Sequence, residues 1–174
     1  MKKKHIGTNK KVTSDDILNA LDVFFRDLTY VKYRELKVEF PYTAGADTIS
    51  HIDYWVIDIV AYGTPNKPRP RPPTTYSIEI KVNRKDFKKE LKNPQKQRWA
   101  LMYSNLFYYC CPKGLIKSDE LPPYAGLLEY ENGEVVESIK APRRDICPPR
   151  WTFVASLLSN YNQDVIKLNR LFRL

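Results

Sequence analysis

Glu79 and Lys81 carry opposite charges two positions apart within the apolar run Ile78-Glu79-Ile80-Lys81-Val82. Side chains alternate between the faces of a β-strand, so Glu79 and Lys81 share one face and their apolar neighbours share the other. Burying charges is costly unless they are paired or bind a metal, so this pattern on a core strand indicates a functional site. The alternative is a salt bridge on a surface strand, and Glu-x-Lys taken alone favours that alternative.

A third charged residue, Asp58, lies in the middle of the apolar run Val56-Ile57-Asp58-Ile59-Val60. The segment from Gly63 to Thr75 is rich in proline and too short for a crossover helix. The strands that flank it are therefore predicted to form an antiparallel hairpin. With the loop centred on residue 69, Asp58 and Glu79 lie opposite each other within one residue. Asp53 is far out of register.

Two carboxylates beside one lysine suit a hard divalent cation, Mg²⁺ or Mn²⁺, with Asp58 and Glu79 as its ligands. Such a cation activates a bound water and stabilises charge on a phosphate, while Lys81 orients the attacking water or neutralises the transition state. These are the parts of a phosphodiesterase. The residues alone leave an equal alternative, an Asp–Lys–Glu ion-pair network without chemistry.

The same residues resemble the signature of a known family. Asp58 followed by Glu79-Ile80-Lys81 is similar to the Asp…Glu-x-Lys motif of the PD-(D/E)XK nuclease superfamily. A wider pattern over residues 35–116 resembles the MmcB-like DNA repair branch and related phage-encoded proteins. Its members are Asp58-Ile-Val-Ala-Tyr-Gly63, Glu79-Ile80-Lys81, Asp86-Phe87, Trp99, Tyr103, Phe107-Tyr108-Tyr109 and Pro112.

The resemblance implies a restriction-endonuclease-like core, an α/β fold whose mixed β-sheet carries an antiparallel hairpin flanked by helices. It implies that Asp58, Glu79 and Lys81 are the catalytic positions. An upstream acid, Glu35 or Glu39, is implied as a further metal ligand.

The charge of the chain favours a polyanionic partner, because 29 Lys and Arg outnumber 20 Asp and Glu, for a net charge of +9. Between residues 81 and 98 eight basic residues face only two acids, Asp86 and Glu90. Arg69 and Arg71 add charge in the proline-rich loop. DNA-backbone contacts are predicted for the basic residues that follow Lys81 in this segment: Arg84, Lys85, Lys88, Lys89, Lys92 and Lys96. Asp86 is expected to complete the start of a helix, and Gln95 and Gln97 to be solvated.

The elements that must position these residues follow from local patterns. A helix begins at Thr13 or Ser14, and a clean alternation predicts a strand from Glu35 to Phe40. Strands are also predicted over 52–62, 76–82 and 106–111, helices over 83–92 and 94–103, and a hairpin turn at Asn132-Gly133. The helical stripe near the N-terminus comprises Ile17, Leu18, Leu21, Phe24, Phe25 and Leu28.

The chain is predicted to hold a flexible basic arm at residues 1–12 and a single nuclease-like domain at residues 13–174. Its C-terminal helix, about residues 150–172, carries an apolar seam. Packing of that seam on the domain's own sheet is the simpler interpretation, and a homodimer or a repair-complex partner is the alternative. The thiols of Cys110, Cys111 and Cys147 are expected to be reduced, in or near the core.

The sequence therefore predicts a metal-dependent DNA nuclease that works in DNA repair, recombination or phage DNA processing. A cytoplasmic location in a bacterial or phage-infected cell is expected, without membrane partners. The competing hypothesis is a catalytically inactive nucleic-acid-binding module or repair-complex subunit on the same fold.

Overall fold

The computed structural model describes residues 11–25, 28–43, 49–65, 74–93, 97–146 and 158, and for 28–43, 49–65 and Trp99 it describes the backbone alone. The strands are β1 Leu28–Thr43, β2 Ile49–Pro65, β3 Thr74–Ile80, β4 Leu106–Pro112, β5 Ala125–Glu131 and β6 Glu134–Ile139. The helices are α1 Ser14–Phe24, α2 Arg84–Leu91, α3 Arg98–Tyr103 and the 3₁₀ turn η2 Ser118–Glu120.

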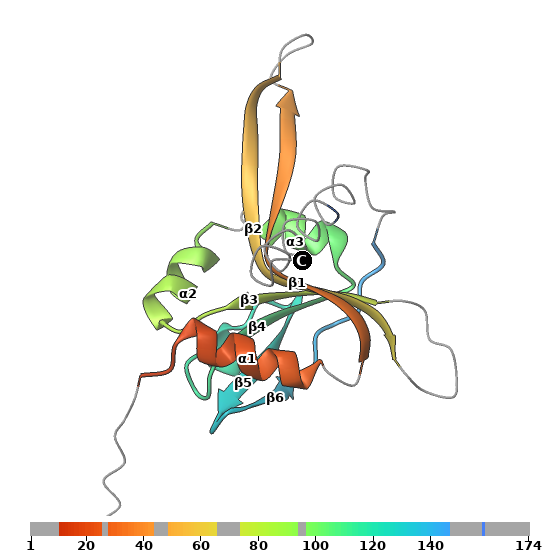
Figure 1. Ribbon diagram of the computed structural model, residues 1–174. Helices are drawn as coiled ribbons and strands as arrows, with labels where there is room; N and C mark the ends of the chain where they lie inside the picture. Colours follow the sequence, from red (N-terminus) through yellow and green to blue (C-terminus); the bar gives the residue numbers. More distant parts are fainter. Residues whose placement is uncertain are drawn as a thin grey trace, which may run out of the picture.

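Within these residues six strands form one mixed sheet in the order β1-β2-β3-β4-β5-β6 (Figure 1). β1, β2 and β3 are antiparallel in turn, β3, β4 and β5 run parallel, and β6 returns antiparallel to β5. Parallel strands need a crossover connection, which α2 and α3 supply between β3 and β4. The prediction of an α/β fold with a mixed sheet and an antiparallel hairpin flanked by helices is confirmed.

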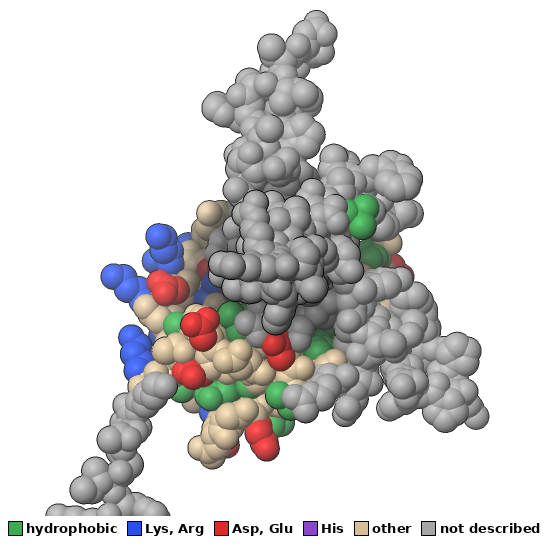
Figure 2. All heavy atoms as spheres, in the orientation of Figure 1, with side chains coloured by type: hydrophobic (Ala, Val, Ile, Leu, Met, Phe, Trp, Pro, Cys, Tyr) green, Lys and Arg blue, Asp and Glu red, His purple; other side chains and the backbone are tan. Residues whose placement is uncertain are grey.

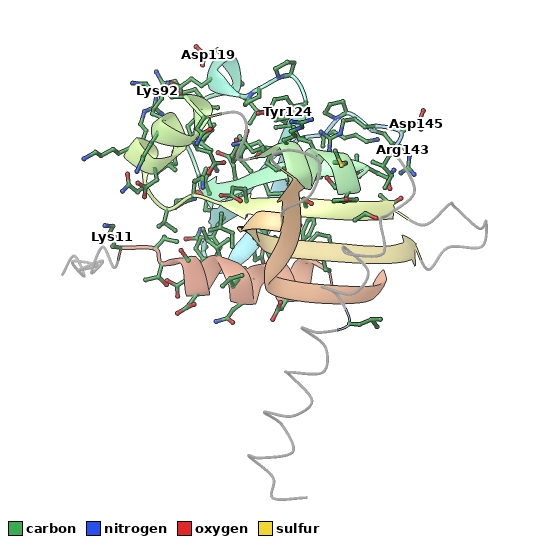
Figure 3. All side chains as sticks on the ribbon, turned by 90° about the horizontal axis from the view of Figure 1, so that it is seen from above. Lys11, Lys92, Asp119, Tyr124, Arg143 and Asp145 are labelled. Carbon is green, nitrogen blue, oxygen red and sulfur yellow. The ribbon has the colours of Figure 1, made fainter. Side chains whose placement is uncertain are left out.

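Helices cover both faces of the sheet (Figures 1 and 3). The α1 face buries Ile17, Leu18, Leu21, Phe25, Ile78, Ile80, Tyr108, Cys110 and Leu128. The opposite face, under α2 and α3, buries Phe87, Ala100, Tyr103, Phe107, Tyr109, Cys111 and Leu127. Burial of these apolar side chains is the main term that holds the three layers together.

Alternation along β3 assigns neighbouring residues to different layers. Ile78 and Ile80 belong to the α1 face. Glu79 and Lys81 therefore belong to the face that α2 and α3 cover, as period-two alternation predicts. The charged pair lies within the protein, and the surface-strand alternative is wrong.

Local signals placed most of the described elements. Thr13 caps α1 in a reciprocal capping box with Asp16, because each side chain satisfies the other's backbone N–H. Asn132 (φ 53°) and Gly133 (φ 90°) both adopt the positive φ that the predicted hairpin turn requires.

Several boundaries differ from the prediction. α1 ends at Phe24, and Leu28 starts β1 and not the last turn of a helix. β1 begins at Leu28, well before Glu35, because residues 28–34 pair with residues 59–65 of β2. α3 begins at Arg98, later than the predicted Pro94, and residues 94–96 lie outside the described residues.

Other predictions fall outside the described residues: the basic arm up to residue 10, Arg69 and Arg71, Gln95, Cys147, and all of the predicted C-terminal helix except Leu158. Leu158 is helical and 58 % exposed. Every helix in the described part of the chain is too short or too polar to cross a membrane.

Candidate functional site

Glu79 and Lys81 form a buried ion pair at the carboxyl end of β3. Lys81 Nζ lies 2.6 Å from Glu79 Oε1, and the two residues are 7 % and 8 % exposed, respectively. The backbone N–H of Lys81 donates to the Cys110 carbonyl oxygen at 2.9 Å, so β4 fixes the residue that follows β3. Buried charges are retained only where partners compensate them, which distinguishes this pair from an exposed salt bridge.

A second carboxylate reaches the same ammonium from helix α2. Lys81 Nζ lies 2.5 Å from Glu90 Oε2, and Glu90 is 4 % exposed. Burial by itself lowers the pKa of Lys81, but the charges and hydrogen bonds of Glu79 and Glu90 outweigh it and raise the pKa above its usual value. Lys81 is therefore held as a cation between two carboxylates.

A chain of buried polar groups continues from Glu90. Gln97 Nε2 donates to Glu90 Oε1 at 2.6 Å and to Tyr109 Oη at 2.7 Å. The Tyr124 hydroxyl donates to Gln97 Oε1 at 2.7 Å. Burial, and then the Glu90 charge, raises the pKa of Tyr109, so its phenol stays protonated. In Figure 3, Tyr124 lies on the side of the sheet that carries α2 and α3.

The prediction that Gln97 is solvated is wrong, because the residue is 3 % exposed. The contribution of Glu90 was missed as well. A helical period would have found Glu90, since it follows the buried Phe87 by three residues and so lies on the same face of α2.

The first hairpin supplies the register of Asp58. Ile59 pairs with Ile78 at the end of the antiparallel β2–β3 ladder, and Asp58 and Glu79 are the next residues of the two strands. The predicted register is confirmed within one residue at Ile59 and Ile78, whereas a direct Asp58–Glu79 pair stays a prediction and the side chain of Asp58 lies outside the described residues. Asp53 instead pairs with Phe40, beyond the part of β2 that pairs with β3.

The two upstream acids differ in register. The pairs Arg34 with Ile59 and Leu36 with Ile57 flank Glu35 and Asp58, so these two residues occupy the same row of the sheet. Glu39 pairs with Tyr54, further along the ribbon. Register therefore favours Glu35 over Glu39 as the acid next to Asp58 and Glu79. Both side chains lie outside the described residues.

A pocket of about 440 Å³ opens beside Lys81, between the start of α1 and α2. Its lining is Ser14, Ile80, Lys81, Val82, Asp86, Lys89, Glu90 and Asn93. Asp86 is an exposed residue of the first turn of α2. Asn83 caps that helix by accepting from the Lys85 N–H at 2.7 Å. Lys81 and Glu90 therefore border a pocket that lies beside α2, whereas Glu79 is not part of its lining.

Basic side chains cover the outer surface of α2 (Figure 2). Lys85, Lys89 and Lys92 are exposed. Arg84 and Lys88 also project outward, but each lies 2.5 Å from Glu120 Oε1, on the turn η2. The hydrogen bond from Lys88 is the largest of the effects that lower the pKa of Glu120 to about 2. Lys96 lies outside the described residues.

No group of three or more His, Cys, Asp or Glu side chains gathers in a metal-binding arrangement among the described residues, which do not include the side chains of Asp58 and Glu35. Cys110 and Cys111 are buried free thiols of β4, as predicted. Burial raises the pKa of Cys111 to about 11, so it is no nucleophile at neutral pH.

No protein-family model and no curated protein matches the chain. Among solved structures it is similar to the SPO1766 protein of unknown function from Silicibacter pomeroyi, with 16 % sequence identity and a TM-score of 0.57. The similarity covers 89 % of this chain and 88 % of that one. At this identity it shows that the two proteins share a fold.

Proposed function

We propose that the protein is a divalent-cation-dependent DNA nuclease of the PD-(D/E)XK type, with a restriction-endonuclease-like core. One observation carries this proposal: the buried Lys81 ammonium lies between Glu79 and Glu90, beside the end of the β2–β3 ladder where Ile59 pairs with Ile78 and Asp58 is the next residue of β2. A strand-borne Glu-x-Lys pair with an acid nearby can hold a divalent cation and present a positive charge to a phosphodiester.

The donor atoms of the site fit Mg²⁺ or Mn²⁺. Asp58 and Glu79 offer carboxylate oxygens, which are the ligands that these cations prefer. Asp58 and Glu79 would hold the cation, with Glu35 in the same row. When bound, the cation would supply Lewis acidity toward the phosphodiester and acidify a water molecule.

The chain's own residues bind and orient the substrate. Lys81 presents a fixed positive charge to the scissile phosphate, where negative charge increases in the transition state. The exposed Lys85, Lys89 and Lys92 hold neighbouring phosphates of the backbone. Such contacts carry no base readout, so DNA shape rather than sequence decides which substrate is cut.

The test is cleavage of single-stranded, duplex, flapped and branched DNA with Mg²⁺ or Mn²⁺. Glu79→Gln and Lys81→Ala are each expected to lower the cleavage rate by about 100-fold or more, because each removes a charge at the reacting phosphate. Glu134→Gln and Lys140→Ala change exposed residues of the same types and should cut like wild type. Circular dichroism checks that every variant is folded.

Binding of DNA by the wild-type protein without cleavage of any of these substrates would overturn the proposal and establish the nucleic-acid-binding module instead. Equal loss in the two control variants would show that the effect is not specific to the site. Work in DNA repair, recombination or phage DNA processing is the role that the family resemblance supports.

A further inference from the structure

The Lys81 ammonium is fixed from two sides. An ammonium carries three N–H donors, and here one is directed to Glu79 and one to Glu90. Lys81 also lines the pocket beside α2. Because Glu79 and Glu90 lie on different elements, the two hydrogen bonds fix the rotation of the ammonium and therefore the direction of its third N–H. A single partner would leave that rotation free.

Glu90 is a costly residue to place at this position. It is 4 % exposed on the inner face of α2, where an apolar side chain would pack without loss of hydration. Both of its carboxylate oxygens have partners, Oε2 with Lys81 and Oε1 with Gln97. The Glu90 carboxylate is thus held in one orientation. A group can position Lys81 only if its own orientation is fixed.

Gln97 fixes that orientation. Its Nε2 donates to Glu90 and Tyr109, while its Oε1 accepts from Tyr124. A flipped amide would turn its oxygen toward the Glu90 carboxylate and its NH₂ toward the Tyr124 hydroxyl, so the surroundings select one orientation. The core therefore aligns Glu90 through Gln97, independently of any ligand.

Glu79 and Lys81 would behave differently without Glu90. Both project from neighbouring positions of one face, so a lysine with no second partner would pair fully with Glu79. That carboxylate is the one expected to hold the cation. Glu90 attracts the Lys81 ammonium toward α2, so the positive charge of Lys81 interacts with two carboxylates and not with Glu79 alone.

We infer that Glu90, aligned by Gln97, is a positioning residue that holds Lys81 toward the pocket and keeps it from competing with a divalent cation for Glu79. The inference rests on the proposed nuclease function. It assigns to α2 a part in the site beyond the binding of DNA phosphates.

The experiment compares wild type with Glu90→Gln and with Glu134→Gln, an exposed acid on β6 that does not line the pocket. Glu90→Gln is expected to lower kcat by about tenfold or more and to raise the Mg²⁺ concentration for half-maximal rate several-fold. The affinity for DNA without cation should stay within about twofold of wild type, because no phosphate contact is lost. Glu134→Gln should match wild type in the rate, in the Mg²⁺ response and in the affinity for DNA.

A measurement without turnover accompanies the kinetics. Ligands that bind the folded state raise the melting temperature, so Mn²⁺ should stabilise Glu90→Gln less than wild type at each concentration. Gln97→Leu should shift kcat and the Mn²⁺ response in the same direction, and Glu90→Asp, which keeps the charge, should recover part of the loss. These two variants keep the test decisive if Glu90→Gln fails to fold.

Wild-type kcat and an unchanged cation response in Glu90→Gln would overturn the positioning role and leave the nuclease proposal intact. A loss explained by weaker DNA binding alone would also overturn it. If the wild-type protein cleaves no DNA, the nuclease proposal fails first and the inference fails with it.

Discussion

At the scale of single residues, the site holds three charged side chains inside the core. Breaking a buried ion pair costs about 3–5 kcal/mol, yet replacing the whole group by apolar residues is often neutral. The trio of Glu79, Lys81 and Glu90, with exposures of 4–8 %, is therefore weak evidence of a contribution to stability, and the proposed nuclease function gives these charges a role.

Lys81→Ala is predicted to destabilise the folded protein by about 3–5 kcal/mol near neutral pH, because it leaves Glu79 and Glu90 buried and uncompensated. Two desolvated like charges have pKa values above those of the unfolded chain, so the free energy of unfolding of this variant should rise as the pH falls from about 7 to about 5. Urea unfolding at several pH values measures both effects.

The wild-type protein should behave in the opposite way at the alkaline end. The pKa of Lys81 is raised above 10.5, so its stabilising contribution is complete below that pH and is lost as the pH rises through the folded value. Lys140→Ala, an exposed lysine, should follow wild type at every pH. A pH-independent loss in Lys81→Ala would contradict the buried-charge account.

At the scale of elements, the buried residues and the exposed basic residues of α2 lie on different faces of the helix. Phe87 and Glu90 point into the protein, while Lys85, Lys89 and Lys92 are exposed along the outer face. Arg84 and Lys88 are held by Glu120, so they also anchor η2 to α2. The three exposed lysines are therefore the ones most directly available to a phosphate backbone.

We predict that Lys85→Gln combined with Lys89→Gln weakens DNA binding and lowers the slope of log K against log salt by about two, since each lost phosphate contact contributes about 0.9. Fluorescence anisotropy over a salt series measures that slope. Lys113→Gln combined with Lys140→Gln removes the same charge elsewhere and should change the slope far less. Equal slopes in the two double variants would show that only net charge matters.

At the scale of the whole molecule, the sheet provides a rigid base for the site. β4 is hydrogen-bonded to strands on both sides and is buried along nearly its whole length, whereas β6 is paired with β5 and is mostly exposed. Since Lys81 is hydrogen-bonded to β4 through Cys110, the central strands set the precision with which the charged groups meet.

Hydrogen exchange is expected to follow this arrangement. Amides of Phe107–Cys111 should exchange slowest, with the free energy of global unfolding, and those of β6 should exchange faster through local opening. Mass spectrometry of peptides from the two strands, at one pH and temperature, measures the difference. Equal protection of β4 and β6 would contradict the idea of a central rigid base.

Local rules in the sequence were sufficient for the core of the site. Alternation with period two put Glu79 and Lys81 on one face, and the short proline-rich loop predicted the antiparallel pairing of β2 with β3, which holds up to Ile59 and Ile78. Both results depend only on strand geometry and on a connection too short to cross over. The predictions of Thr13 as a helix cap and of a turn at Asn132-Gly133 likewise depended only on residues close in sequence.

Only the tertiary structure decided what surrounds Lys81. The helical period places Glu90 on the same face of α2 as Phe87, but neither that period nor the polar side chain of Gln97 identifies the groups that these two residues contact. Their burial depends on how the crossover helices pack on the sheet, and the pairing of Arg84 and Lys88 depends on where η2 lies. The alternation of side chains along a strand and the length of a loop depend on residues that are close in sequence. The partner of a buried charge depends instead on groups that are distant in sequence and that folding brings together.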